Sequence, residues 1–93
     1  DQMILLGRRT ATERTASFLV TLRDRWKRIN GQSAHVALPM TRADIADYLG
    51  LTVETVSRSF TRLRQENLIA ARDPQHIELL DAKRLLALAE ARA

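Results

Sequence analysis

Gly50 separates two short helical patterns, and this spacing restricts the possible folds more than any other feature of the sequence. Thr41 and Asp44 form a T-x-x-D start for a helix of about eight residues that ends at Gly50. Thr52 is a suitable N-cap for a second helix over residues 53–66. Because glycine lets the chain reverse within about three or four residues, we expect the two helices to form a helix-turn-helix. The inward side of the first helix is apolar and consists of Ile45, Ala46 and Leu49.

The second helix, 53–66, has two distinct faces. The apolar face consists of Val56, Phe60 and Leu63. The polar face follows the i, i+3, i+4, i+7 rule and consists of Glu54, Ser57, Arg58 and Thr61. A helix can enter the major groove of DNA, where a carboxylate accepts from cytosine N4, a guanidinium grips guanine and a hydroxyl suits either kind of base edge. We therefore expect Glu54, Ser57 and Arg58 to contact bases.

A longer helix is expected before this motif, from about Thr10 to Ile29. Thr10 and Glu13 form a capping box, and Asn30-Gly31 ends the helix. Its apolar side consists of Thr15, Phe18, Leu19, Leu22, Trp26 and Ile29. Its charged side consists of Arg14, Arg23, Asp24, Arg25, Lys27 and Arg28. Residues 32–34 are expected to form a loop, and 36–38 a short strand closed by Pro39.

A hairpin and a last helix are expected after the motif. Asn67 can adopt the left-handed conformation that ends a helix. Two short apolar stretches, 67–71 and 76–79, flank a turn at Asp73-Pro74, which indicates a β-hairpin. Asp81 then caps a helix from Ala82 to about Ala91, with Leu85, Leu86 and Ala89 as its apolar residues. The fold class is therefore mainly α with a small antiparallel β-hairpin wing, a winged helix-turn-helix in one domain over residues 1–93.

The cations of this chain suggest an anionic partner. The 15 lysines and arginines exceed the 11 acids by 4, and only Lys27 and Lys83 are lysines. The forked guanidinium group of arginine matches phosphate and base edges better than the ammonium group of lysine does. Helix N-termini also attract anions. We therefore expect contacts to the DNA backbone from Thr41, Arg42, Thr52, Thr55, Thr61, Arg62 and Arg72, with Gln75 or His76 as further contributors from the wing.

The sequence argues against several classes of protein and site. The chain has no cysteine, hence no disulfide or thiolate metal site, and no apolar run approaches the roughly 20 residues of a membrane span. His35 and His76 have no ligand partners at metal-binding spacing. No nucleophile, phosphate loop or carboxylate pair indicates an enzyme or a cofactor. The aromatic residues Phe18, Trp26, Tyr48 and Phe60 are expected in the core, not on a surface that stacks single-stranded bases.

The stretch TRADIADYLGLTVETVSR, residues 41–58, closely resembles the helix-turn-helix of the CRP/FNR family, and the resemblance extends over roughly 6–86. Val53 departs from the Arg-Glu-x-x-x-Arg pattern of the cyclic-AMP receptor branch. Glu54, Ser57 and Arg58 instead match the Glu-x-x-Ser-Arg pattern of the FNR and FixK branch. That branch typically reads palindromes with TTGAT-type half-sites. Asn67 stands where the family often has glycine, which changes nothing chemical.

The resemblance also implies parts that this sequence does not contain. Family members carry a sensor domain and a dimerisation helix, and residues 1–8 would be the tail of that helix. The chain does not begin with methionine and shows no signal peptide, so we expect it to be a fragment of a cytoplasmic protein. The full-length protein would be a homodimer that contacts double-stranded DNA and RNA polymerase, without a membrane. In the FNR branch the cluster-binding cysteines lie mainly outside this region, so the lack of cysteine in this chain does not decide the effector of the full-length protein.

Two other functions remain open at this point. A winged helix can serve as a protein–protein interaction module without sequence-specific DNA binding, because a fold does not determine a function. The domain could also bind nucleic acid without regard to sequence. Glu54 argues against this second alternative, since phosphates repel a carboxylate on the binding face.

Overall fold

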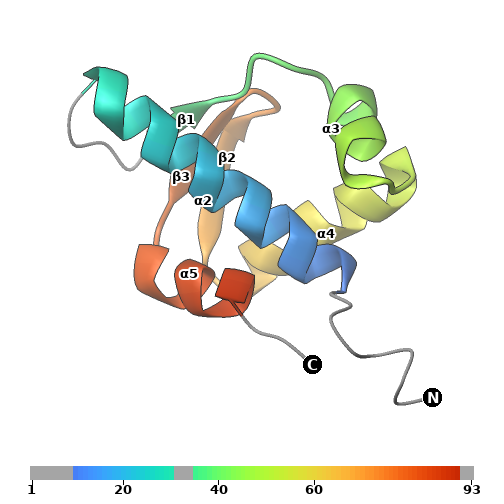
Figure 1. Cartoon of the computed structure of the whole chain (residues 1–93). Helices are drawn as coiled ribbons and strands as arrows, with labels where there is room; N and C mark the ends of the chain where they lie inside the picture. The colour runs from blue at the N-terminus through green and yellow to red at the C-terminus, as the bar shows by residue number, and fades with distance from the viewer. Residues whose placement is uncertain (1–9, 31–34, 91–93) are drawn as a thin grey trace.

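The computed structural model describes residues 10–30 and 35–90, which form four helices and three strands (Figure 1). Gly31, the loop 32–34, the tail 1–8 and the side chain of Ile29 lie outside the described part. The elements are α2 (Ala11–Asn30), β1 (His35–Ala37), α3 (Arg42–Leu49), α4 (Val53–Gln65), β2 (Ile69–Asp73), β3 (His76–Leu79) and α5 (Ala82–Glu90).

All four predicted helix starts have the expected side-chain cap. The first two helices carry complete capping boxes, in which a threonine and an acid satisfy each other's backbone amides. In each case the side chain of the cap residue accepts from the backbone amide three residues later. The four bonds are Thr10 from Glu13 at 3.1 Å, Thr41 from Asp44 at 3.1 Å, Thr52 from Thr55 at 3.1 Å, and Asp81 from Arg84 at 3.0 Å. Short-range chemistry alone therefore fixes where each helix begins.

The sheet has three strands in the order β1-β3-β2, with both pairs antiparallel. The hairpin of β2 and β3 is confirmed. The short strand occurs at His35–Ala37, one residue earlier than 36–38, and it pairs with β3, so that His35 lies opposite Glu78. Leu38 follows the strand but still donates its amide to the Gln75 carbonyl at 2.7 Å. The wing therefore supplies the central strand and one edge strand of a sheet whose other edge, β1, leads into α3.

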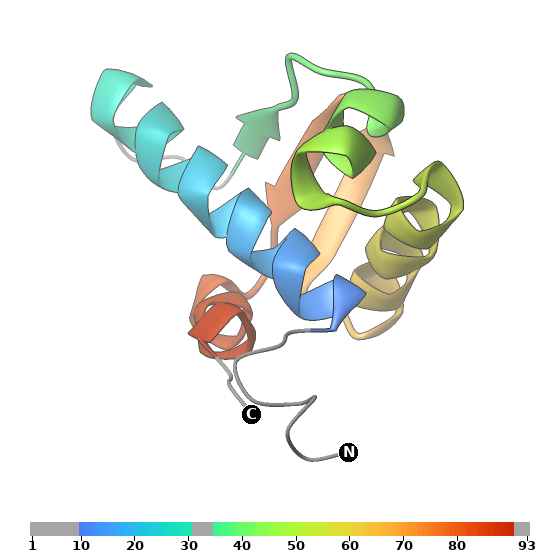
Figure 2. The same cartoon turned by 45° about the vertical axis from the view of Figure 1, so that its right-hand side comes forward.

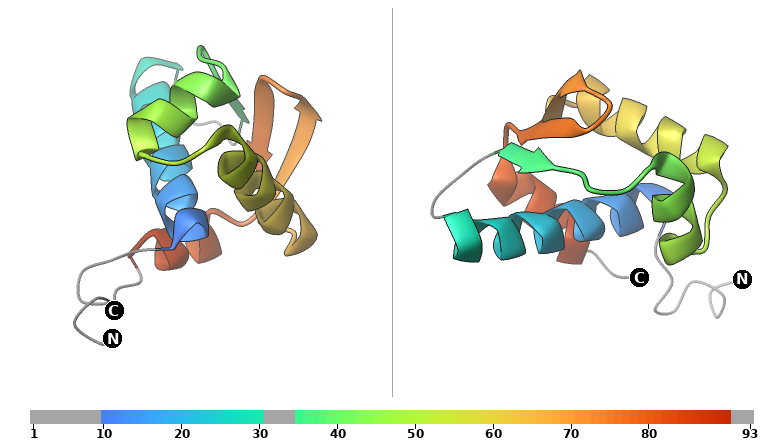
Figure 3. Two further views of the ribbon diagram at one scale, coloured as in Figure 1. Left: turned by 90° about the vertical axis from the view of Figure 1, so that its right-hand side faces the viewer. Right: turned by 90° about the horizontal axis from the view of Figure 1, so that it is seen from above.

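Helix α2 runs across the domain beside the sheet, while α3 and α4 lie together at one side (Figures 2 and 3). α2 packs on α5 and α4, and α3 packs on α4. The fully buried large side chains come from nearly every element and include Leu19, Ile45, Leu63, Ile69, Ile77 and Leu85. One core therefore holds the helix-turn-helix and the wing in a fixed relation.

Tyr48 corrects the prediction that all four aromatic residues are buried. Its side chain is 74% exposed, whereas Phe18 and Phe60 are buried and Trp26 is half-buried. α3 is only eight residues long and directs Ile45 and Ala46 into the core. Tyr48 therefore lies at the edge of that face, with its ring tilted against Phe18 at a centroid distance of 5.7 Å.

Candidate nucleic-acid interface

Helix α4 separates its two faces as its sequence predicts. Val56, Phe60 and Leu63 are buried, and Ser59 is buried with them, which the apolar pattern does not reveal. On the other side Glu54, Ser57 and Arg58 are exposed, and Thr61 is half-buried. The helix ends at Gln65, one residue before the expected end, and Asn67 adopts the predicted left-handed conformation with φ 58°. The three predicted base-reading side chains therefore share one solvent-facing stripe in the first two turns of a firmly packed helix.

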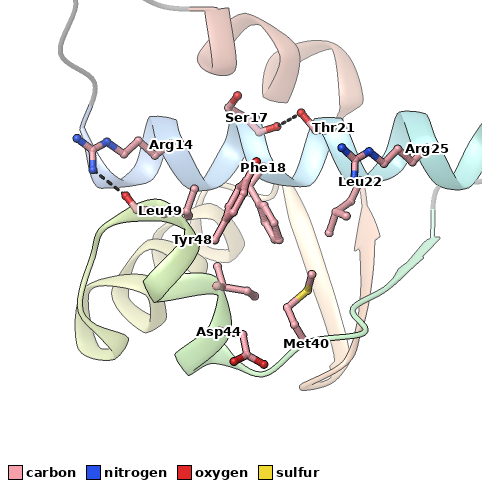
Figure 4. A pocket seen from close by; sticks show the side chains of 11 residues that line it. Arg14, Ser17, Phe18, Thr21, Leu22, Arg25, Met40, Asp44, Tyr48 and Leu49 are labelled. Carbon is pink, nitrogen blue, oxygen red and sulfur yellow. Dashed lines mark hydrogen bonds between the residues drawn. The ribbon is translucent and has the colours of Figure 1, made fainter.

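The turn between α3 and α4 sets the direction of that stripe. Gly50 has φ 71°, and its amide points back at the carbonyls that end α3. Leu51 donates to the Ala46 carbonyl at 2.8 Å, which completes a tight helix end. Arg14 of α2 donates to the Leu49 carbonyl at 3.0 Å across 35 residues of sequence (Figure 4). The sequence places Arg14 on a charged helix face and gives no signal for this contact.

Four of the residues predicted to contact the DNA backbone have partners within α4 or at its start. The Thr52 hydroxyl caps the helix and donates to the Thr55 hydroxyl at 2.9 Å. Thr61 donates to the Ser57 carbonyl at 3.0 Å. Arg62 donates to Glu66 at 2.6 Å, one turn later on an exposed surface. These contacts order the side chains along the helix while they remain accessible at its surface.

Arg42, the first residue of α3, lies against α4. Its guanidinium carbon is 4.1 Å from the centroid of the Phe60 ring, a cation–π arrangement worth about 0.5–2 kcal/mol. Burial of the guanidinium, followed by the positive charge of Arg64, lowers the pKa of Arg42 from its usual value. Arginine nevertheless stays charged in proteins. The two helices of the motif thus hold a cation at their junction, beside the capped N-terminus that Thr41 provides.

The wing carries a second set of polar side chains. Arg72 is exposed, with its guanidinium 3.9 Å from the Glu78 carboxylate. At the turn, one oxygen of Asp73 accepts from the amides of Gln75 and His76, each at 2.9 Å, and the His76 ring nitrogen lies 2.9 Å from the same carboxylate. The His76 side chain, and next the Gln75 amide, lower the pKa of the Asp73 carboxyl. The wing turn is thus ordered around one acid.

Replacing Asp73 by asparagine is expected to make the domain less sensitive to acid. Because the folded-state pKa of Asp73 is depressed, its charge stabilises the fold above the ordinary aspartate pKa of about 4 and this contribution is lost as the pH falls through the folded-state value. Asparagine keeps an acceptor for the turn amides but cannot titrate. Melting temperatures taken from neutral pH down to about pH 2 should fall more steeply for the wild type. Asp47→Asn, at an exposed position of α3, is the control, and parallel curves for wild type and Asp73→Asn would refute the expectation.

Two of the clefts in the described part of the chain are lined partly by α3. One lies between α3, α4 and the wing, has a volume of about 420 Å³ and is lined in part by Arg42, Phe60 and Arg64. The other lies between α2 and α3, with Tyr48 among the side chains that line it (Figure 4), and none of its lining residues comes from α4 or the wing. The first cleft therefore adjoins the exposed stripe of α4, and the second is separate from it.

Two kinds of site are absent from the described residues 10–30 and 35–90. No helix in this part of the chain is long and apolar enough to cross a membrane. No group of three or more histidine, cysteine or acidic side chains in the same part could hold a metal ion. The two histidines instead lie near carboxylates, His35 at 3.8 Å from Glu78 and His76 at 2.9 Å from Asp73.

Comparison with known proteins identifies the family. Residues 13–88 match the Crp-like helix-turn-helix domain. The chain is 57% identical over 91 residues to the transcriptional activatory protein AadR of Rhodopseudomonas palustris, and 54% identical over 91 residues to the nitrogen fixation regulation protein FixK of Bradyrhizobium diazoefficiens. Each alignment covers 98% of this chain but 38% of the relative. The chain thus spans well under half the length of these two proteins.

A solved structure shows the same arrangement. FixK2 from Bradyrhizobium japonicum superposes with a TM-score of 0.77 at 43% sequence identity, over 98% of this chain and 44% of that one. This similarity over nearly the whole chain, together with the match to the Crp-like domain, confirms the winged helix-turn-helix. The chain therefore belongs to the family of Crp-like helix-turn-helix domains and is FixK-like within it.

Proposed function

We propose that this chain is the DNA-binding domain of a bacterial transcription regulator, and that α4 reads a TTGAT-like half-site in the major groove. The observation that carries the proposal is the exposed stripe of Glu54, Ser57 and Arg58 on a helix whose opposite face is buried. The names of the relatives support it, since AadR and FixK are a transcriptional activatory protein and a nitrogen fixation regulator.

Each side chain of the stripe has a distinct role in this proposal. Arg58 donates to the O6 and N7 acceptors of a guanine, and Glu54 accepts from the N4 amino group of a cytosine. Ser57 bonds to either kind of base edge or permits close approach. Phosphate contacts set the register without specifying sequence, and they come from Thr41, Arg42, Thr52, Thr55, Thr61, Arg62 and Arg72.

The longer protein would act as a homodimer whose two-fold axis matches a palindromic site. Residues 1–8 would continue a dimerisation helix, and RNA polymerase would be a further partner. Linking two half-site binders adds about 10²- to 10⁴-fold in affinity, so the chain alone is expected to bind weakly. Such a regulator would work in the cytoplasm without catalysing a reaction, and the signal that it senses would be read outside this domain.

The test is a titration of a labelled palindromic duplex that contains TTGAT half-sites. A matched duplex has the half-site guanines and their paired cytosines exchanged, and both are titrated at two salt concentrations. Preference for the intact site is expected. Equal, salt-sensitive binding would leave only phosphate attraction, with a slope of about 0.9 per neutralised phosphate.

If the chain binds both duplexes equally, the same titration is repeated on a dimeric form with the dimerisation helix restored. Equal binding of both duplexes by the dimer would refute the proposed readout. The absence of binding by the dimer would instead favour a protein–protein interaction module.

A further inference from the structure

The cleft between α3, α4 and the wing contains two guanidinium groups and a buried aromatic ring. It is lined by Arg42 of α3, by Phe60 and Arg64 of α4, and by Asp73 and Pro74 at the tip of the wing. A neighbouring hollow continues from Arg42 along the same wing turn. Positive side chains from two helices therefore converge in a concave site beside the stripe that faces DNA in the proposed function.

We infer that this cleft binds one phosphate of the DNA backbone between Arg42 and Arg64, and that Phe60 is the positioning residue that holds Arg42 in place for it. The inference rests on the proposed function. It adds Arg64 and Phe60, which neither the sequence pattern nor the proposed base readout assigns to DNA binding.

The geometry of Arg42 supports a positioning role for Phe60. The guanidinium carbon lies 4.1 Å from the centroid of a ring that is 4% exposed, so a fixed part of the core holds this planar group in place. All five N–H donors of arginine point outward within that plane. Stacking therefore immobilises the group and leaves its donors free for a phosphate, which removes much of the entropy that a long flexible side chain loses on binding.

Arg64 supplies the second cation. Its guanidinium donates to the Thr61 hydroxyl at 3.1 Å, which orders the side chain along α4. The pKa of Arg42 is lowered first by burial and further by the positive charge of Arg64. Two like charges in one cleft repel each other, and an anion between them attracts both and offsets this repulsion.

Asp73 is the acid in the wall of the cleft, and it has partners of its own. Its carboxylate accepts from two wing amides and lies 2.9 Å from the His76 ring nitrogen. These contacts hold the carboxylate at the wing turn and keep it from pairing with the arginines. Arg62, by contrast, is paired with Glu66 and does not line this cleft.

The experiment measures how the affinity of the chain for the TTGAT duplex depends on salt. Wild type is compared with Arg42→Gln, Arg64→Gln, Phe60→Leu and the double variant Arg42→Gln with Phe60→Leu. Arg84→Gln is the control, since it removes one exposed positive charge on α5, away from the cleft. Unfolding curves of every variant give the folded fraction, which corrects the affinities for any loss of core packing at Phe60.

Arg42→Gln is expected to lower the slope of log K against log salt by about 0.9, the value for one phosphate. Arg64→Gln and Phe60→Leu should lower it in the same direction, and Phe60→Leu should have no further effect once Arg42 is replaced. The preference for the intact duplex over the exchanged one should not change, because phosphates carry no sequence information. Arg84→Gln should keep the wild-type slope.

Two results would overturn the inference. One is a Phe60→Leu variant that loses stability but, once folded, keeps the wild-type slope, because Phe60 would then be a packing residue only. The other is an Arg64→Gln variant that behaves like Arg84→Gln. Either result leaves the proposed function intact if the wild type still prefers the intact duplex, whereas equal binding of both duplexes by the dimeric form of the wild type contradicts the proposed function itself.

Discussion

Replacing Arg58 by alanine is expected to weaken binding of the chain to the intact TTGAT duplex by about 5- to 150-fold, which corresponds to about 1–3 kcal/mol. Arg58 is exposed in the second turn of α4, beside Glu54 and Ser57, where a guanidinium can meet both acceptors of a guanine. The loss should concentrate on the duplex that retains those guanines. Titration of both duplexes with wild type and variant therefore measures sequence discrimination as well as affinity.

The control for this prediction is Arg84→Ala, which removes an exposed arginine from α5. It should keep the preference between the two duplexes. If Arg58→Ala weakened both duplexes by the same factor, Arg58 would be a phosphate contact, because a contact that carries no sequence information cannot discriminate between bases.

The second large effect is expected from Leu63→Ala, which should destabilise the domain by about 2–5 kcal/mol. Leu63 lies on the buried face of α4 and is fully shielded from solvent. Leucine and alanine have similar helix propensities, so the change reports mainly on lost packing. A small domain has about 5–15 kcal/mol of total stability, so this loss should shift a urea unfolding curve by a large fraction of its midpoint.

Gln65→Ala is the matched control, since Gln65 is exposed in the last turn of the same helix. Its unfolding curve should lie within about 0.5 kcal/mol of the wild type. Equal destabilisation by both substitutions would mean that α4 is not anchored through its apolar face and is not held rigidly for base reading.

The sequence predicts the helices well because their signals are local. A threonine and an acid three residues later satisfy each other's amides whatever the rest of the chain does, and Gly50 and Asn67 adopt the left-handed conformations that their positions require. The exposure of Glu54, Ser57 and Arg58 follows from the same kind of rule, since one buried stripe on α4 places the opposite stripe in solvent.

The features that the sequence does not predict depend on contacts between distant segments. The hydrogen bond from Arg14 to the Leu49 carbonyl and the stacking of Arg42 on Phe60 both require the crossing of two helices to be known. Tyr48 has the spacing of a core residue, but its burial depends on how far α2 extends over α3. Periodicity describes one helix at a time and cannot report on such crossings.

The order of the strands also has a consequence for how the domain forms. β2 and β3 are joined by a two-residue turn, whereas β1 pairs with β3 across a segment that contains both α3 and α4. Closing a longer loop costs more chain entropy, so the hairpin is expected to form first and β1 to join it late. On this route the hairpin provides the strand edge on which β1 pairs. The connection from β1 into α3 then becomes ordered only after the helix-turn-helix has packed against the hairpin.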